Sequence, residues 1–158
     1  MLRPLSLIIL LSGPLMLTAQ DDALPPTNGK VLDFVERHLN KRVGTGECWD
    51  LAAAALRSAG ATWDGAYGFG RPVDPDQEPV LPGDIVQFEG VEVRYSTPTT
   101  EHRENMSHHS AIIHAVLGEG HYRLAHQNFG RGRRTVGLTD WSTVHTTKGT
   151  WTFFRPLP

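Results

Sequence analysis

The stretch that decides the fold of this chain is GTGECWDLAAAAL, residues 44–56, in which two glycines lead to the single cysteine and then to an alanine-rich run. Such a run is typical of a helix, and Gly60 lies where that helix would end. The sequence therefore predicts a helix from about Cys48 to Ser58, with the thiol in its first turn. The positive end of the helix macrodipole favours thiolate over thiol at this position.

A lone cysteine is most often a small buried hydrophobic residue, so the position of Cys48 alone does not identify a nucleophile. A cysteine nucleophile also needs a base and a polar group that orients the base. His109 and the run His126-Gln127-Asn128 supply both kinds of group. We therefore take Cys48, His109, His126 and Asn128 as candidate catalytic residues.

The rest of the chain predicts one more helix and then strands. Residues 31–43 have the apolar spacing of an amphipathic helix. Short apolar runs predict strands at residues 85–88, 92–95, 109–116, 121–127, 135–138 and 151–154. Residues 61–80 and 96–106 lack a sustained period, so we expect loops there. Two helices followed by about five or six antiparallel strands predict an α+β fold, with the helices packed on the sheet.

A hairpin turn is predicted at Leu117-Gly118-Glu119-Gly120. If Leu117 pairs with Gly120, His109 lies opposite Asn128, and His126 shares a face of the sheet with both. The candidate base and both candidate orienting groups then converge. A slip of one residue in the pairing would separate them.

The N-terminus has the pattern of a secretory signal peptide, with Arg3, then an apolar run, then Ala19 before an acidic pair. We expect cleavage after residue 19 and a secreted or periplasmic protein without membrane contact. An uncleaved anchor is the alternative, but Gly13-Pro14 interrupts the apolar run, which is short for a membrane span.

Residues 1–19 are thus assigned as signal peptide, residues 20–30 as a flexible lead-in and residues 31–158 as one domain. The 39% hydrophobic and 20% charged content is that of an ordinary globular protein. A net charge of −2 argues against general nucleic-acid binding. One cysteine cannot form an internal disulfide, so an exported chain carries a free thiol, which is easier to understand if the thiol has a function.

Histidines gather in residues 102–109, but their spacing matches no standard zinc pattern. We therefore expect neither a metal nor a cofactor. The arginine-rich run at residues 130–134 could bind an anionic ligand, and a solvated loop is the favoured interpretation. The sequence predicts no particular oligomeric state.

Four sequence blocks in this order resemble the papain-like NlpC/CHAP superfamily of cysteine peptidases and amidases, many of which cut peptidoglycan. The blocks are residues 46–52, 82–88, 109–113 and 125–128. Within the superfamily the chain is most similar to the cysteine-proteinase-fold domain of fungal actin-patch (myosin tail region-interacting) proteins. That group shares the Gly-Glu-Cys-Trp start, the Pro-Gly-Asp-Ile strand and a Gln-Asn ending. The resemblance covers about residues 32–154.

The resemblance implies that Cys48 is the nucleophile and His109 the general base. CHAP domains usually have a glutamate before Gln-Asn, where this chain has His126. A neutral imidazole stabilises an imidazolium less than a carboxylate does, although NlpC-type enzymes use a histidine as the third polar group. Asn128 matches the CHAP asparagine, so both His126 and Asn128 are candidates for orienting His109. The backbone N–H of Cys48 is the candidate oxyanion donor.

Two functions are consistent with these observations. The first is a secreted papain-like thiol hydrolase that cleaves an amide bond in a peptide or peptidoglycan-like substrate. The second is a non-catalytic cysteine-proteinase-fold domain used for binding or scaffolding, as the similarity to a cytoskeletal scaffold suggests.

Overall fold

The structure is a computed structural model that describes residues 23–96, 98–130 and 133–158. The elements are α1 (Pro26–His38), α2 (Cys48–Ala59), β1 (Arg71–Val73), β2 (Ile85–Ser96), β3 (Glu101–Gly118), β4 (His121–His126), β5 (Gly137–Ser142), a 3-10 helix (Thr143–His145) and β6 (Thr146–Arg155). The expected signal peptide, residues 1–19, lies outside the described residues. Within the described ranges, none of the helices has the length and apolar character needed to cross a membrane.

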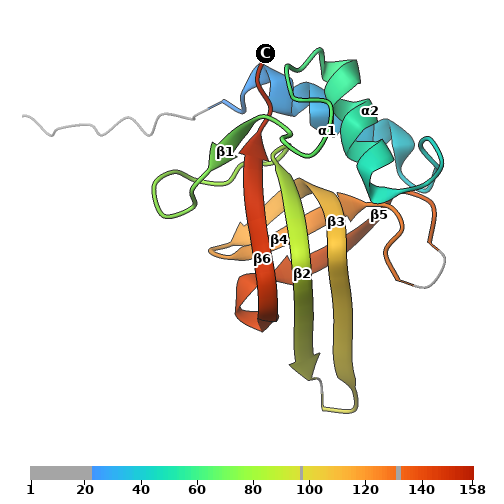
Figure 1. Ribbon diagram of the computed structural model, residues 1–158, viewed down its shortest axis with the longest axis vertical. Coiled ribbons are helices and arrows are strands. Elements are labelled where there is room, and N and C mark those ends of the chain that lie inside the picture. The colour runs from blue at the N-terminus through green and yellow to red at the C-terminus, as the bar shows by residue number, and fades with distance from the viewer. Residues whose placement is uncertain (1–22, 97, 131–132) are drawn as a thin grey trace, which may run out of the picture.

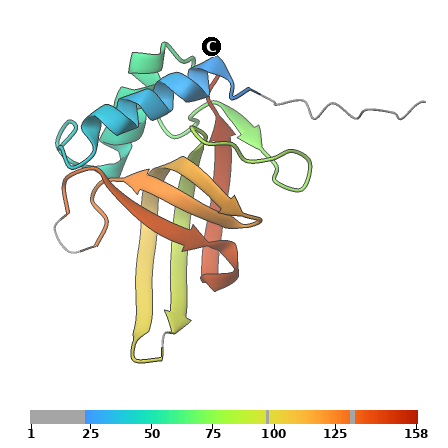
Figure 2. The ribbon, with the colours of Figure 1, turned by 180° about the vertical axis from the view of Figure 1, so that it is seen from behind.

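Among the described residues, six strands form one antiparallel sheet in the order β1-β6-β2-β3-β4-β5. Both helices lie at one end of this sheet, and the long β2–β3 hairpin extends away from them (Figure 1). Seen from behind, β4 and β5 cross the long strands (Figure 2). The prediction of an α+β fold with two helices followed by an antiparallel sheet is confirmed.

Apolar side chains form two core clusters, one on each side of the sheet. Neighbouring strand residues alternate between them, because successive side chains of a strand point to opposite faces. Ile85 and Ile112 pack against the helices, whereas Val86 and Ala111 belong to the other cluster. The helix-side cluster includes Val31, Val35, Leu51, Ala52, Ala55, Leu56, Phe69, Ala125 and Val136. The second cluster includes Phe88, Ile113, Tyr122, Leu124, Trp141 and Phe153. Each fully buried large aliphatic side chain stabilises the fold by about 1.5–3 kcal/mol.

The first helix begins earlier than predicted. The sequence predicted a flexible lead-in over residues 20–30 and a helix over residues 31–43, whereas α1 starts at Pro26 and is followed by Leu39 in extended conformation. Proline is favoured in a first turn, because the N–H it lacks would have no partner there. The lead-in prediction is therefore wrong for residues 26–30, and the predicted domain boundary at residue 31 lies inside α1.

Asn28 fixes this early helix start. Its side chain is fully buried, and Nδ2 donates to Asp84 Oδ1 at 2.8 Å and to the Pro82 carbonyl at 2.9 Å. Asp84 is also fully buried and accepts from Arg155 Nε at 3.1 Å and from Arg155 Nη2 at 2.9 Å. These contacts join the first turn of α1 to the start of β2 and the end of β6. Sequence periodicity around Asn28 carries no sign of them.

Strands β2 and β3 are longer than the strands predicted in this part of the chain, and they form a hairpin. Residues 96–106 were expected to form a loop, but residues 101–106 belong to β3, and the predicted strand at residues 92–95 is the continuation of β2. Polar residues dominate this end, so apolar alternation gave no strand signal. Cross-strand charge pairs contribute instead, as between Arg103 Nη2 and Glu92 Oε2 at 2.6 Å. The loop predicted over residues 61–80 also contains the short strand β1.

The turn between β3 and β4 differs from the predicted one, yet the strand pairing farther from the turn has the predicted register. Gly118 pairs with His121, so Glu119 and Gly120 form the turn, instead of the predicted pairing of Leu117 with Gly120. Two register shifts along β3 then compensate, and Ile112 pairs with Ala125, as the prediction required. Each shift places one extra residue on β3, which is the definition of a β-bulge.

Candidate active site

The loop before α2 positions Cys48 through a set of hydrogen bonds to Asp50. One oxygen of this carboxylate accepts from Thr45 N–H at 2.8 Å, Thr45 Oγ1 at 2.6 Å and Glu47 N–H at 3.2 Å. A Cβ on Gly44 would lie 2.8 Å from the carboxyl carbon of Asp50, and Gly44 has a φ of +58°. Glycine is therefore needed here. Cys48 follows as the first helical residue, so its N–H has no acceptor within the helix.

Gln127 connects this loop to the end of β4. Its side chain is completely buried. Its Oε1 accepts from Val43 N–H at 2.7 Å, and its Nε2 donates to the carbonyls of Val43 at 3.1 Å and Glu47 at 3.0 Å. The position of Cys48 relative to the sheet is thus fixed by a residue 79 positions later in the chain.

His109 and His126 form a buried pair. Nε2 of His109 lies 2.9 Å from Nδ1 of His126, and the two residues are 5% and 2% exposed. Phe129 packs against both rings, with centroid distances of 5.8 Å to His109 and 4.2 Å to His126. Water is therefore largely excluded from the contact between the two imidazoles.

Thr139 extends the pair into a chain of three polar side chains. Its Oγ1 lies 2.9 Å from Nε2 of His126, the imidazole nitrogen that does not face His109. Thr139 is in β5, where it pairs with Leu124 of β4, two positions before His126. The sequence analysis did not identify Thr139, because a threonine in a strand carries no functional signal until the strand pairing is known.

Burial keeps both imidazoles neutral. Burial, with a smaller contribution from the nearby His108, lowers the pKa of His109 to about 4. Burial also moves the pKa of His126 well below its ordinary value, with smaller contributions from His109 and Arg133 in the same direction. Neither ring has a carboxylate as a hydrogen-bond partner among the described residues. At pH 7 the pair is uncharged.

Asn128 contacts the loop before Cys48 rather than His109. Its Nδ2 donates to Glu47 Oε2 at 2.6 Å, and Arg134 pairs with the other oxygen of Glu47. Asn128 has a φ of +53°, in the left-handed region that asparagine tolerates. Of the two candidates for orienting His109, His126 is the residue that forms the hydrogen bond to it.

Cys48, His109 and Asn128 line one hollow of about 430 Å³, which we call the Cys48 hollow. Its other lining residues are Glu47, Trp49, Asp50, Tyr67, Asn105, Met106, Ser107 and His108. Cys48 is half-buried, so its thiol can be reached from this hollow. Three of the four residues predicted from sequence thus share one hollow, and His126 lies behind His109.

The described residues contain no group of three or more His, Cys, Asp or Glu side chains arranged to hold a metal ion. His108, one of the clustered histidines, lies with its Nδ1 2.9 Å from the carboxylate of Glu89. Its ring packs edge-on against Tyr67 at a centroid distance of 4.4 Å. His108 thus forms part of the rim of the Cys48 hollow.

A helix that starts with a cysteine, packed on an antiparallel sheet that carries a histidine, defines a cysteine-proteinase-fold domain. The AIM3/BBC1 cysteine proteinase-fold domain family matches residues 27–158, and the chain belongs to this family. No curated protein and no solved structure matches the chain. The family match confirms the similarity to fungal actin-patch proteins inferred from the sequence blocks.

Proposed function

We propose that this protein is a thiol hydrolase that cleaves an amide bond, with Cys48 as nucleophile and His109 as general base. One observation carries the proposal: the hydrogen bond between Nε2 of His109 and Nδ1 of His126, 2.9 Å long, on the border of the hollow that contains Cys48. This bond occupies one nitrogen of His109 and leaves Nδ1 as the nitrogen that can accept the thiol proton.

The three-residue chain can set the tautomer that catalysis requires. For Nδ1 of His109 to accept a proton, its Nε2 must carry hydrogen and donate to Nδ1 of His126. Nε2 of His126 then carries hydrogen and donates to Thr139 Oγ1, 2.9 Å away. Thr139 therefore acts as a positioning residue, because its hydroxyl can accept this bond.

The reaction then proceeds in two steps. Sγ of Cys48 attacks the carbonyl carbon as His109 takes the thiol proton, and the backbone N–H of Cys48 donates to the developing oxyanion. The carbon–nitrogen bond breaks, and His109 returns the proton to the leaving amine. In the second step water, deprotonated by His109, attacks the thioester. The carboxylic acid leaves and the free thiol is restored.

Among the described residues no carboxylate bonds to His109, and this determines the rate that we expect. The imidazolium formed during attack is stabilised by the neutral ring of His126, which compensates a positive charge less well than a carboxylate does. The pKa of about 4 for His109 means that the base is unprotonated at neutral pH. We expect a slow hydrolase in which proton transfer accompanies thiol attack.

The proposal includes the compartment and the substrate class. The pattern of residues 1–19 supports export with cleavage of a signal peptide. A peptide or peptidoglycan-like amide is the proposed substrate, because such amides are substrates of the superfamily that the four sequence blocks resemble.

The test compares the wild-type protein with Cys48→Ser on three amides: capped peptide amides, a peptidoglycan tetrapeptide stem and a ubiquitin-like C-terminal amide. We expect Cys48→Ser to lower turnover by at least about 10³-fold on the amide that is cleaved, and His109→Ala to do the same. His121→Ala, at an exposed position in β4, is the matched control and should leave turnover unchanged. Equal turnover by wild type and Cys48→Ser would contradict the proposal.

The second candidate function is binding or scaffolding without catalysis. It is favoured by the name of the matching family, which specifies a fold and no activity. It is also favoured by the neutral histidine pair, for which the described part of the chain supplies no carboxylate partner. If none of the three amides is cleaved in a Cys48-dependent way, this candidate takes precedence. Native-state alkylation by iodoacetamide gives an independent measurement, because a nucleophilic Cys48 should react faster than free cysteine at pH 7.

A further inference from the structure

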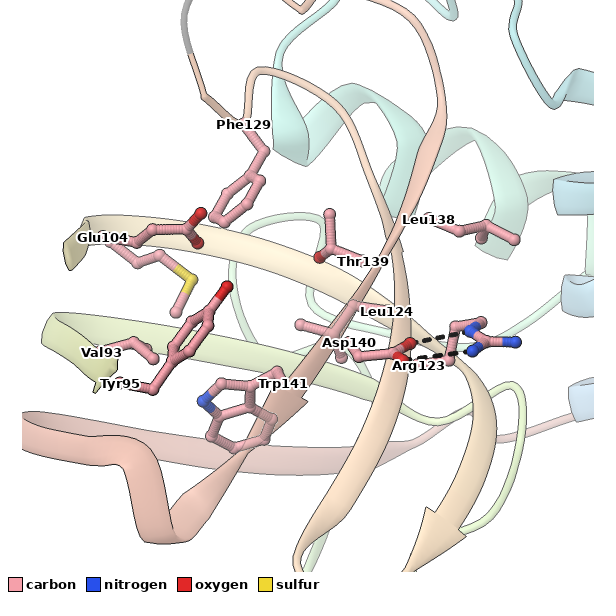
Figure 3. A pocket seen from close by; sticks show the side chains of 11 residues that line it. Val93, Tyr95, Glu104, Arg123, Leu124, Phe129, Leu138, Thr139, Asp140 and Trp141 are labelled. Atoms are coloured by element: carbon pink, nitrogen blue, oxygen red, sulfur yellow. Dashed lines mark hydrogen bonds and ion pairs between the residues drawn. The ribbon is translucent and has the colours of Figure 1, made fainter. Parts of the chain in front are cut away.

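A second hollow has Phe129 and Thr139 in its lining (Figure 3). It has a volume of about 540 Å³, and we call it the Glu104 hollow. Its walls come from the β2–β3 hairpin on one side and from β4 and β5 on the other. Thr139 lines this hollow and also bonds to His126, so the hollow reaches the rear of the histidine pair.

The Glu104 hollow contains one carboxylate without a partner. Figure 3 shows Glu104, Tyr95 and Phe129 pointing into the same space, with Arg123 and Asp140 paired to one side. Arg123 bonds to Asp140 through Nε at 2.8 Å and Nη2 at 3.2 Å, which compensates both charges. Within the described ranges, Glu104 forms no hydrogen bond or ion pair. Burial raises its pKa, with His102 as a weaker, opposing influence.

Aromatic side chains surround this carboxylate. Tyr95 is held between two histidine rings, with centroid distances of 4.6 Å to His102 and 5.5 Å to His145. Trp141 is fixed by a bond from its Nε1 to Thr146 Oγ1 at 3.1 Å. Apolar ring surface packs against methylene groups, and a carboxylate attracts a cation. A carboxylate among aromatic rings therefore favours a ligand with an apolar stem and a positive end.

The two hollows are linked through shared lining residues. Between them lies a third hollow of about 460 Å³, which shares Asn105 and His109 with the Cys48 hollow and shares Glu104 and Phe129 with the Glu104 hollow. Met106 lines all three. An extended chain whose scissile amide lies at Cys48 can thus continue along β3 and place a later side chain beside Glu104.

We propose that the Glu104 hollow is a specificity subsite that holds a cationic side chain, lysine or arginine, of the peptide substrate. The charged end lies at the carboxylate of Glu104, and the methylene stem lies against Tyr95 and Phe129. This inference deepens the proposed function and rests on it, because the bound peptide is a substrate only if the protein is a hydrolase. The recognition itself is a binding event that can be measured without cleavage.

The experiment measures binding to the full chain carrying Cys48→Ser, which keeps the hollow and removes turnover. The probes are capped alanine pentapeptides with one lysine, arginine or norleucine moved through the five positions. Norleucine has the stem of lysine without its charge. Titration by calorimetry should show one position at which lysine or arginine binds at least about tenfold tighter than norleucine, which corresponds to about 1.4 kcal/mol.

Glu104→Gln keeps the shape of the side chain and removes its charge. Because Glu104 forms no hydrogen bond or ion pair with the described residues, this change should leave the fold intact. It should reduce the preference for lysine over norleucine to within about twofold. Glu119→Gln, the same change at the β3–β4 turn and outside the hollow, should keep the full preference. Tyr95→Leu should weaken lysine binding, because the stem loses its packing against the ring, whereas Tyr95→Phe keeps the ring and the affinity.

The inference is overturned if lysine, arginine and norleucine peptides bind alike at every position, or if the preference survives Glu104→Gln. Its failure is distinguishable from failure of the proposed function. Cys48-dependent cleavage without any cationic preference removes the subsite and leaves the hydrolase. A preference that depends on Glu104, in a protein that cleaves no amide, keeps the cation site and removes the hydrolase.

Discussion

The two hollows on either side of the histidine pair each contain one glutamate, and the two glutamates are held differently. On the Cys48 side, the carboxylate of Glu47 is compensated by Arg134 and by Asn128 at 2.6 Å. On the other side, Glu104 faces aromatic rings, and the described part of the chain provides no hydrogen bond or ion pair to its carboxylate.

This difference separates a carboxylate used for architecture from one available to a ligand. Glu47 is also contacted through its backbone by Asp50 and Gln127, so the whole residue belongs to the loop that positions Cys48. Glu104 is on a strand that would pair in the same way with many other side chains. The packing of the strand therefore does not require a carboxylate at this position, and we assign Glu104 to the binding of a ligand.

After Cys48→Ser and His109→Ala, the largest effect is expected at His126, which lies behind His109 and bonds to Thr139 of the Glu104 hollow. His126→Ala should lower the turnover proposed for the Cys48 side roughly 10- to 1000-fold, because His109 loses its orienting partner while the nucleophile and base remain. His126→Glu should preserve or raise turnover, since a negative charge stabilises protonated His109. Steady-state kinetics of both variants on the cleaved amide measure this.

The pH profile separates orientation from mere packing at His126. A glutamate beside His109 raises the pKa of that imidazole, so the acidic limb of the rate profile should move to higher pH in His126→Glu. A purely structural role would change the rate and leave the limb in place. An unchanged limb would therefore contradict the role assigned to His126.

A second prediction concerns stability in weak acid. The unfolded chain binds a proton at the ordinary histidine pKa of 6.5, whereas His109 in the folded protein binds one only near pH 4. The stability from neutral His109 is thus complete above about pH 6.5 and is lost as the pH falls toward 4. For His109 the loss is roughly 3 kcal/mol, and burial of His126 acts in the same direction.

Urea denaturation at several pH values between 7 and 4.5 measures this loss. As the pH is lowered, the free energy of unfolding should decrease in the wild type. It should decrease less steeply in His109→Gln, because glutamine cannot bind the proton. His121→Ala, at an exposed position, should retain the wild-type slope. Equal slopes for wild type and His109→Gln would show that the pair is not held neutral.

The smallest effect is expected for Glu47→Gln. Its ion pair with Arg134 is exposed, and exposed pairs contribute about 0–1 kcal/mol to stability. The unfolding free energy should fall by no more than that, and turnover should change less than about threefold. A loss comparable to that of His126→Ala would mean that Glu47 takes part in the chemistry, and the contrast with Glu104 would fail.

Much of the candidate site could be predicted from the sequence because two local patterns place it. The glycine approach and the alanine run place Cys48 at a helix start, as the structure has it. Strand alternation places His109 and His126 on one face, and the observed pairing of Ile112 with Ala125 has the predicted register. The predicted turn was displaced by one residue on each strand, and two bulges on β3 compensated for the error.

The choice between His126 and Asn128 could not be predicted in this way. Both lie near the end of β4, and alternation assigns them to the same face. Asn128 leaves the strand with a positive φ and turns to Glu47, a contact across 81 positions. Similarly, Thr139 bonds to His126 because β4 pairs with β5. Nothing in the sequence near Thr139 indicates this pairing.

The sequence by itself determined the α+β class, the helix that carries the thiol and the register that places His109 and His126 on one face of the sheet. These features depend on short-range periodicity, caps and turns, which act over a few residues. Only the tertiary structure decided that the pair is buried and neutral, that Asn128 contacts the loop before Cys48 and that Glu104 faces a hollow. Burial and pairing depend on strands brought together from distant parts of the chain, and the desolvation that sets the charge of a histidine exists only after they pack.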